Sequence, residues 1–272
     1  MIKPVIAIPA RLESKRLPNK LIMKVGKKTI IERVLVSCIQ SKSPSEVYLC
    51  TDNELVEKIG HDYGVNVLMT SKACNSGTER IASVLNKIIS LVWEESFEEM
   101  DIKKKEQVLT NTAIINIQAD QPFLESDLIS KISDNLVEDG HIKQIVTPIY
   151  KLSRDNIHNP NVVKTLLNKR RKAIYFSRSA LPHVRDINPD EWHLYHDYWG
   201  HYGIYAYRAD VLNIFRNLDM SKLEEVEKLE QLKFIDAGYE ISTFEVETQS
   251  LSIDTFEQLK EARKIASRFD NI

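Results

Sequence analysis

The sequence contains no long hydrophobic run. Its most apolar amino-terminal stretch, residues 5–10, is six residues long and contains Pro9. A signal peptide has a longer apolar core, and a membrane-spanning helix needs about 20 apolar residues. We therefore expect a soluble, cytoplasmic protein that does not insert into a membrane.

Cysteine is scarce, and neither sign of charge is in marked excess. The three cysteines, Cys38, Cys50 and Cys74, are an odd number without Cys-x-x-Cys spacing. This pattern argues against a disulfide scaffold or a zinc cluster and fits a reducing compartment. Lysine and arginine number 37 against 39 aspartates and glutamates, a net charge of −2. Nucleic acid is therefore not an expected partner.

Glycine is also scarce, with eight residues in 272. Neither Gly-x-Gly-x-x-Gly nor Gly-x-x-x-x-Gly-Lys-Ser/Thr can be drawn through them, so the fingerprints of dinucleotide-binding and P-loop proteins are missing. A nicotinamide-dependent oxidoreductase, one rival interpretation of an α/β chain, is therefore disfavoured.

The first half of the chain alternates predicted strands and helices. The predicted strands are residues 5–8, 46–50, 65–69 and 113–118. The predicted helices are residues 30–39, a helix capped by Asn53 that runs through Tyr63 to a terminating Gly64, and a long helix opened by a capping box of Ser76 and Glu79. This alternation predicts an α/β fold with a mostly parallel sheet flanked by helices.

The second half is less regular. Its predicted strands are residues 144–150, 162–167, 202–207 and 239–246, and capping boxes at Ser221 and Thr255 predict two helices. The polar residues 186–197 predict a loop or lid. Strands without regular helices indicate a smaller mixed-sheet insertion lobe on the α/β core.

The segment after the first predicted strand is crowded with cations. Between residues 3 and 28 there are eight lysines and arginines and a single acid, Glu13, a local net charge of +7. The eight are Lys3, Arg11, Lys15, Arg16, Lys20, Lys24, Lys27 and Lys28. Such a segment is either a solvated basic loop or a polyphosphate site at the carboxyl edge of the sheet. Pro9 and Pro18 stiffen it, which favours the second interpretation.

Two aspartates are placed to face these cations. Asp120 follows the predicted strand ending near residue 118, and Asp254 follows Ile253, which we expect to end the last strand. An aspartate after a buried strand is also a common cap or turn former, and for Asp52 we favour capping of the next helix. Two carboxylates beside bound phosphates would suit Mg²⁺, which takes oxygen ligands and keeps substrate phosphates in its shell.

The second half offers further polar candidates. Arg178 is suited to gripping a carboxylate with two parallel hydrogen bonds, whereas His201 alone is weak evidence. Three glutamates recur every three residues beside an apolar stripe that we expect to be core: Glu224, Glu227 and Glu230 beside Leu223, Val226, Leu229 and Leu232. The glutamates are either a solvated rim or acceptors for a polyhydroxylated ligand.

Nine short motifs, taken in order, resemble one enzyme family. They are Ile8-Pro9-Ala10-Arg11, Arg16-Leu17-Pro18, Thr51-Asp52, Ser76-Gly77-Thr78-Glu79-Arg80, Asn159-Pro160-Asn161, Tyr175-Phe176-Ser177-Arg178, His201-Tyr202-Gly203-Ile204-Tyr205, Leu229-Glu230-Gln231-Leu232 and Asp254-Thr255. In this order they resemble the CMP-Kdo synthetases, the 3-deoxy-manno-octulosonate (Kdo) cytidylyltransferases. The resemblance spans nearly the whole chain.

The resemblance implies a nucleotidyltransferase α/β fold in which residues 1–272 form one domain. Residues of about 150–215 would contribute a sugar-binding and dimerisation lobe of a homodimer. The implied reaction is Mg²⁺-dependent: CTP and a Kdo-type acidic 2-keto sugar give CMP-sugar and pyrophosphate for lipopolysaccharide synthesis.

The resemblance also implies roles for individual residues. The implied catalytic residues are Arg11, Arg16, Lys20 and Asp120, and the implied metal ligands are Asp120 and Asp254. The implied nucleotide-binding residues are Pro9, Ala10, Arg11, Lys20, Ser76, Arg80 and Gln118. The implied sugar-binding residues are Arg178, His201, Tyr205, Glu227, Glu230 and Gln231.

The chain departs from the family pattern beside Asp120. The usual Gln-Gly-Asp-Glu-Pro is Gln118-Ala119-Asp120-Gln121-Pro122, and the usual Leu-Pro-Gly-Lys is Leu17-Pro18-Asn19-Lys20. Asparagine tolerates the positive φ of the glycine it replaces, so we expect that turn to persist. The changes at Ala119 and Gln121 leave three alternatives open: the 8-amino-3,8-dideoxy analogue of Kdo, another acidic 2-keto sugar, or a catalytically silent CTP-binding protein.

Overall fold

The computed structural model describes residues 2–14, 16–44, 46–138, 140–247 and 249–269. The chain divides into two compact units. The first comprises Met1–Ile142, Ala206–Arg216 and Ser250–Ile272, and the second comprises Lys143–Tyr205 and Asn217–Gln249. The predicted assignment of sugar binding and dimerisation to residues of about 150–215 stays a prediction.

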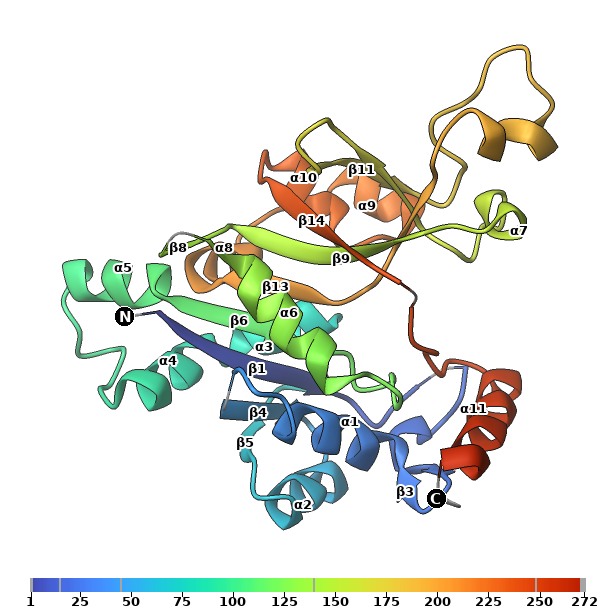
Figure 1. Cartoon of the computed structure of the whole chain (residues 1–272). Coiled ribbons are helices and arrows are strands. Elements are labelled where there is room, and N and C mark those ends of the chain that lie inside the picture. The colour runs from blue at the N-terminus through green and yellow to red at the C-terminus, as the bar shows by residue number, and fades with distance from the viewer. Residues whose placement is uncertain (1, 15, 45, 139, 248, 270–272) are drawn as a thin grey trace. The chain divides into compact units, whose positions relative to one another are not determined.

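The first unit is built on a largely parallel sheet (Figure 1). Its strands are β1 (Lys3–Ala10), β2 (Lys24–Val25), β3 (Lys28–Thr29), β4 (Glu46–Thr51), β5 (Asn66–Met69), β6 (Thr112–Asn116), β7 (Val137–Glu138), β8 (His141–Ile142) and β13 (Tyr205–Arg208). In the main sheet the order is β13-β6-β1-β4-β5, and β1 runs parallel to both β4 and β6. Its helices are η1 (Lys20–Ile22), α1 (Ile30–Ile39), α2 (Glu54–Asp62), α3 (Gly77–Ser83), α4 (Leu85–Trp93), α5 (Ile102–Thr110), α6 (Ser126–Leu136), α8 (Ala209–Phe215) and α11 (Phe256–Phe269).

The parallel register brings the ends of three strands to one edge of the sheet. Ala10 at the end of β1 lies opposite Thr51 at the end of β4, and Ala7 lies opposite Asn116 at the end of β6. Strand β1 is buried from Val5 to Ala10, as its apolar sequence predicts for a central parallel strand. The segments that follow β1, β4 and β6 therefore emerge together, and these segments carry Arg11, Asp52 and Asp120.

Local signals explain why the helices of this unit begin and end where they do. The Asn53 side chain accepts hydrogen bonds from the backbone N–H groups of Leu55 and Val56, which caps α2. Gly64 follows this helix with φ of 71°, a conformation that glycine adopts without steric cost. At α11, Thr255 and Gln258 exchange both bonds of the predicted capping box.

The second unit contains a mixed sheet. Its elements are β9 (Ile145–Lys151), α7 (Arg154–Ile157), β10 (Lys164–Leu167), β11 (Ala173–Ser177), η2 (Pro189–Leu194), β12 (Trp199–His201), α9 (Lys222–Glu227), α10 (Leu232–Asp236) and β14 (Ile241–Val246). Strands β11, β10, β12 and β9 pair antiparallel in that order, whereas β14 runs parallel to β9. The α/β fold class, with a mixed, partly parallel sheet flanked by helices, is confirmed.

Three predictions about the first unit are wrong. The long helix after Ser76 is two helices, α3 and α4, because Val84 leaves helical geometry with φ of −114° and ψ of 10°. Only half of the predicted capping box forms: Ser76 accepts from the Glu79 N–H, but the Glu79 carboxylate accepts from Asn75. Among the described residues between Val246 and Asp254 there is no strand, because the last strand, β14, already ends at Val246.

Two predictions about the second unit also need correction. The strand predicted at residues 202–207 is interrupted, because the Thr147 hydroxyl donates to the carbonyls of Tyr202 and Ile204, and regular pairing resumes only in β13. The expected apolar stripe is broken at Lys228, whose φ of 55° ends α9, so Val226 is 72% exposed while Leu229 and Leu232 are buried. Residues 186–197 form a loop around η2, and a lid function remains a prediction.

Candidate active site

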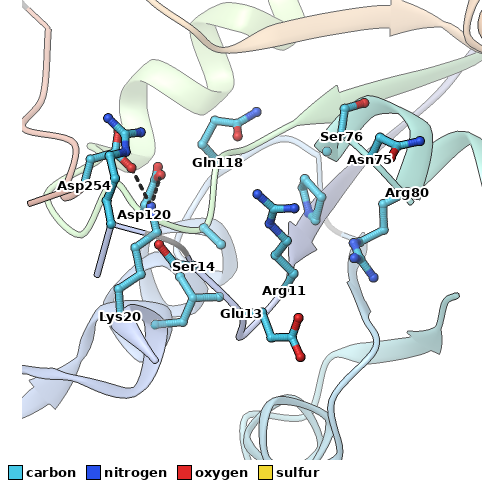
Figure 2. A pocket seen from close by; sticks show the side chains of 15 residues that line it. Arg11, Glu13, Ser14, Lys20, Asn75, Ser76, Arg80, Gln118, Asp120 and Asp254 are labelled. Carbon is cyan, nitrogen blue, oxygen red and sulfur yellow. Dashed lines mark hydrogen bonds and ion pairs between the residues drawn. The ribbon is translucent and has the colours of Figure 1, made fainter. Parts of the chain in front are cut away.

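A cavity of about 510 Å³ lies in the first unit at the carboxyl edge of its sheet (Figure 2). Four parts of the chain line it: residues 9–21, residues 75–80, residues 118–120 and Asp254. The predicted site residues among them are Pro9, Arg11, Arg16, Lys20, Ser76, Arg80, Gln118, Asp120 and Asp254. Ala10, also predicted to bind the nucleotide, is fully buried in β1 and does not line this cavity. Lys15 lies outside the described residues.

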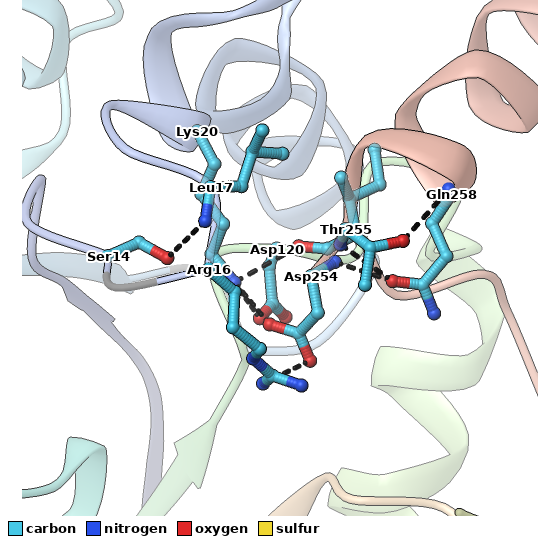
Figure 3. Close-up of polar contacts among 9 residues, drawn as sticks. Ser14, Arg16, Leu17, Lys20, Asp120, Asp254, Thr255 and Gln258 are labelled. Atoms are coloured by element: carbon cyan, nitrogen blue, oxygen red, sulfur yellow. Dashed lines mark hydrogen bonds and ion pairs between the residues drawn. The ribbon is translucent and has the colours of Figure 1, made fainter.

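Asp120 and Asp254, which are 134 positions apart in sequence, meet at one ammonium group (Figure 3). Lys20 Nζ lies 2.7 Å from Asp120 Oδ2 and 2.9 Å from Asp254 Oδ1, and it also donates to the carbonyl of Ile253 at 3.0 Å. Burial alone would lower the pKa of Lys20, but the charges and hydrogen bonds of both aspartates outweigh it and the pKa is raised. Lys20 therefore stays charged at neutral pH.

Backbone geometry places these three groups. Asn19 adopts φ of 56°, as expected for the asparagine that stands in place of the family's glycine, and Lys20 opens η1 immediately after it. The Ile253 N–H donates to the Asp120 carbonyl at 3.0 Å, so the extended segment before α11 is tied to the loop after β6. Asp254 itself lies next to the Thr255 cap of α11. This backbone hydrogen bond thus brings the carboxylates together without the strand that was predicted there.

Arg16 completes the charge pairing at the mouth of this cavity. Its guanidinium lies 2.9 Å from Asp254 Oδ2, although the side chain is 67% exposed. An exposed pair of this kind contributes little stability and is easily exchanged for another anion. Arg16 can therefore move from the carboxylate to a ligand at low cost.

Arg80 reaches the cavity from α3 but uses its guanidinium inside the protein. Its side chain is 2% exposed, Nη2 lies 2.8 Å from Asp52 Oδ2, and Nη1 donates to the Thr70 hydroxyl. Asp52, whose side chain is 14% exposed, is thus the partly buried counter-ion of Arg80 and not a helix cap, which corrects the sequence prediction; the cap is Asn53. The pair ties the ends of β4 and β5 to α3, so the structure indicates that Arg80 positions the nearby cavity wall.

In the second unit, Arg178 and Glu227 lie together. The Glu227 carboxylate accepts from the Ser177 hydroxyl at 2.6 Å and from the Arg178 N–H at 3.0 Å. The Arg178 guanidinium donates to the carbonyls of Glu227 at 3.0 Å and Pro160 at 3.2 Å. Beneath them the fully buried Lys164 donates to the carbonyls of Asn159, Val162 and Arg178. The burial of Lys164 was not predicted, because no local sequence pattern distinguishes a buried lysine in a strand from an exposed one.

His201 is the second polar feature of this unit. Its ring lies 5.1 Å from that of Phe176 and 5.2 Å from that of Tyr205, measured between centroids. Within the described part of the chain, His201 Nε2 and Gln231 Nε2 are buried polar atoms without a hydrogen-bond partner. Leaving such groups unsatisfied costs about 1–3 kcal/mol each, so each of these two atoms has a hydrogen bond to offer to a bound water or to a polar ligand.

Comparisons with known proteins agree along nearly the whole chain. A family model described as cytidylyltransferase matches residues 5–242. A 3-deoxy-manno-octulosonate cytidylyltransferase of Chlorobaculum parvum is 33% identical over 264 residues, 96% of each chain, and one of Nitratiruptor sp. is 35% identical over 258 residues, 94% of this chain and 96% of its own. A solved CMP:2-keto-3-deoxy-manno-octonic acid synthetase, complexed with CTP, is 31% identical with a TM-score of 0.83, covering 98% of this chain and 99% of its own.

The chain belongs to the CMP-Kdo synthetase family of cytidylyltransferases.

The family to which the chain belongs implies a metal-dependent reaction. Among the described residues, no cluster of three or more His, Cys, Asp or Glu side chains could hold a metal ion. Mg²⁺ is, however, often bound through one or two carboxylates together with substrate phosphates and water. Since Asp120 and Asp254 already share one cation, Lys20 Nζ, these two carboxylates can also act as a pair of metal ligands.

Several cavity residues were not assigned a role from the sequence. They are Glu13, Ser14, Leu21, Asn75, Gly77 and Ala119. Each is a near neighbour of a predicted residue, so the motif signal found the segments but not every side chain. No helix in the described part of the chain is both long and apolar enough to cross a membrane.

We predict that His201 makes stability depend on pH. Burial lowers its pKa to about 3, whereas the ordinary value is 6.5. Between these values the unfolded chain binds a proton that the folded chain does not, so the free energy of unfolding falls as the pH falls below 6.5, by up to about 1.4 kcal/mol per pH unit. Urea denaturation at pH 4.5–7.5 should show this slope, and His201→Gln should flatten it.

The matched control is His61→Gln, since His61 lies on α2 with a side chain that is 62% exposed. A flattening in this variant equal to that of His201→Gln would mean that the buried ring is not the source of the slope. An equal slope in wild type and His201→Gln would contradict the burial of a neutral imidazole.

Proposed function

We propose that the chain couples CTP to an acidic 2-keto sugar of the Kdo type, giving CMP-sugar and pyrophosphate. The observation that carries this proposal is the meeting of Asp120 and Asp254 beside Arg16 and Lys20 in one cavity of the first unit. The related synthetase, whose solved structure is complexed with CTP, supports CTP as the nucleotide. We further propose a cytoplasmic homodimer that acts in lipopolysaccharide synthesis.

The cavity suits a nucleoside triphosphate. Arg11, Arg16 and Lys20 supply three positive charges within one lining. Ser76 caps α3 with its side chain, and Pro9, Gly77 and Gln118 form the adjoining wall. Cations replace the water and counter-ions of the phosphates, and the wall is available to the nucleoside.

The second unit suits a sugar acid. His201 is neutral over the working pH range because burial lowers its pKa to about 3, so its ring can accept or donate a hydrogen bond to a hydroxyl group. Gln231 offers an amide beside Leu232 at the start of α10. We propose that Tyr205, Glu227 and Glu230 take part in the same recognition. Arg178 remains the proposed partner of the sugar carboxylate, although its present hydrogen bonds go to two backbone carbonyls.

The proposed mechanism depends on positioning and charge, as phosphoryl-type transfers generally do. The anomeric hydroxyl attacks the α-phosphorus of CTP in line, and pyrophosphate leaves. Arg11, Arg16 and Lys20 stabilise the negative charge on the leaving pyrophosphate. Asp120 and Asp254 would hold Mg²⁺, which when bound supplies Lewis-acid stabilisation of phosphate charge. No side chain is assigned as a general base.

The question of which sugar is used concerns the two residues beside Asp120 that depart from the family pattern, Ala119 and Gln121. Gln121 is buried and accepts a hydrogen bond from the Ser250 hydroxyl at 3.4 Å. A neutral amide is less costly to bury than the glutamate usual at this position. Ala119 lines the cavity without displacing Asp120 from Lys20. These features support transfer of CMP over silent CTP binding, and they leave Kdo, its 8-amino-3,8-dideoxy analogue and other acidic 2-keto sugars as substrates to compare.

The test is pyrophosphate release from CTP and Mg²⁺ with a panel of 2-keto sugar acids that includes Kdo and the 8-amino analogue. We expect release with at least one of these acids and none when the acid is omitted. ATP, GTP and UTP in place of CTP serve as nucleotide controls. Binding of CTP without pyrophosphate release from any acid would instead establish the catalytically silent protein.

A further inference from the structure

The ammonium group of Lys20 has no hydrogen-bond donor left for a ligand. It carries three N–H donors, and three acceptors surround it: Asp120 Oδ2, Asp254 Oδ1 and the Ile253 carbonyl, at 2.7, 2.9 and 3.0 Å. Its side chain is only 12% exposed. The Lys20 ammonium group can therefore donate hydrogen bonds to a triphosphate in this cavity only if it breaks those to its present acceptors.

The charges of this cluster also balance. Asp254 uses Oδ1 for Lys20 and Oδ2 for Arg16, while Asp120 uses Oδ2 for Lys20. Two carboxylates thus face two cations, and no net negative charge remains to attract a divalent ion. An ion that enters between the carboxylates must displace the ammonium group or be repelled by it at close range.

We infer that Lys20 acts as an internal counter-cation of Asp120 and Asp254, so that a divalent metal ion binds these carboxylates strongly only after a triphosphate has drawn Lys20 away. This inference rests on the proposed function, since it takes the ligand of the cavity to be a nucleoside triphosphate. Lys20 is then a positioning residue that couples the two ligands.

The coupling follows from the chemistry of the groups. A triphosphate offers Lys20 several charged oxygens in place of two carboxylates, and the flexible lysine stem lets the ammonium group move. The freed carboxylates then carry two negative charges beside phosphate oxygens, which is the ligand set that Mg²⁺ prefers. Because coupling between two ligands is reciprocal, the metal ion strengthens triphosphate binding by the same factor.

The first test uses wild-type protein and Mn²⁺, whose free concentration is read from its electron paramagnetic resonance signal. Mn²⁺ is titrated with and without α,β-methylene-CTP, and the affinity of the analogue itself for Mn²⁺ is measured separately and subtracted. We expect weak binding to the nucleotide-free protein and at least about tenfold tighter binding in the ternary complex. Equal affinities would overturn the inference, and this arm needs no variant to fold.

The second test removes the internal cation. Lys20→Gln keeps an amide donor for the carboxylates but no charge. The nucleotide-free variant should bind Mn²⁺ at least about tenfold more tightly than wild type. The double variant Lys20→Gln, Asp120→Asn should lose this gain, which places the ion at the carboxylates. An affinity in Lys20→Gln equal to that of wild type would overturn the inference.

A matched control separates a local effect from net charge. Lys28 belongs to the same basic segment and has an exposed side chain in β3, so Lys28→Gln makes the same change of charge away from the carboxylates. It should leave Mn²⁺ affinity at the wild-type value. A gain equal to that of Lys20→Gln would mean that overall charge, not the contact, controls the metal ion.

The Mn²⁺-binding experiments test the inference separately from the pyrophosphate-release assay, which tests the proposed function. If pyrophosphate is released but the Mn²⁺ affinity changes neither on addition of the analogue nor in Lys20→Gln, the inference fails and the proposed function stands. If no sugar acid supports release but the analogue tightens Mn²⁺ binding, the proposed transfer fails and the coupling stands.

Discussion

Asp120→Asn is expected to lower the turnover number by at least about 1,000-fold, which corresponds to about 4 kcal/mol of lost transition-state stabilisation. The amide has nearly the shape of the carboxylate and can still accept a hydrogen bond from Lys20, whose Nζ lies 2.7 Å away. It lacks the charge that a metal ligand needs, and it leaves Lys20 with one carboxylate partner in place of two. The loss should therefore fall on catalysis and not on folding.

Pyrophosphate release under saturating CTP and sugar acid measures this effect, with circular dichroism to verify the fold. Asp134→Asn is the matched control, because it makes the same chemical change on the exposed face of α6. It should retain wild-type turnover. Near-normal turnover in Asp120→Asn would remove Asp120 from the proposed metal site.

The largest effect on stability is expected from Asp52→Ala, about 3–5 kcal/mol in the free energy of unfolding. Arg80 is 2% exposed, and its Nη2 lies 2.8 Å from Asp52 Oδ2. Removal of the carboxylate leaves a buried guanidinium whose remaining partners, Thr70 and Ser71, are uncharged. A buried charge that loses its counter-ion is far more costly than the pair itself is stabilising.

Urea denaturation at neutral pH measures this loss. Glu240→Ala is the control: it breaks the ion pair with Lys172, in which the glutamate is 63% exposed, and should cost less than about 1 kcal/mol. The double variant Asp52→Leu, Arg80→Met should recover much of the stability, since apolar side chains can replace a buried ion pair at little net cost. A loss in Asp52→Ala no larger than in Glu240→Ala would show that Arg80 is not held by this pair.

Much of the first unit could be predicted because its signals are local. The Asn53 cap and Gly64 terminator define α2 within a few residues of sequence, and the helix predicted at residues 30–39 is confirmed as α1. Prediction failed where a distant side chain competes with local pattern. The Thr147 hydroxyl interrupts the strand expected at residues 202–207, and no periodicity near Tyr202 reveals that contact.

The candidate site shows the same division. Its segments could be found from motifs, because Arg11, Lys20, Asp120 and Asp254 stand in short runs that resemble the family pattern. Their partners could not. The sequence does not show whether Asp52 caps a helix or neutralises Arg80. It also does not show whether Lys20 faces solvent or two carboxylates. Both depend on where separate strands end in space.

The amino-acid sequence alone determined the alternation of strands and helices, the cation-rich segment after β1 and the family to which the chain belongs, because short-range periodicity and ordered motifs carry that information. Only the tertiary structure decided which charges meet. Asp120 and Asp254 come together because the Ile253 N–H bonds to the Asp120 carbonyl, and Lys20 reaches both from a turn that starts at Asn19. Electrostatic pairing depends on distances between atoms, and the spacing of residues along a chain does not specify those distances.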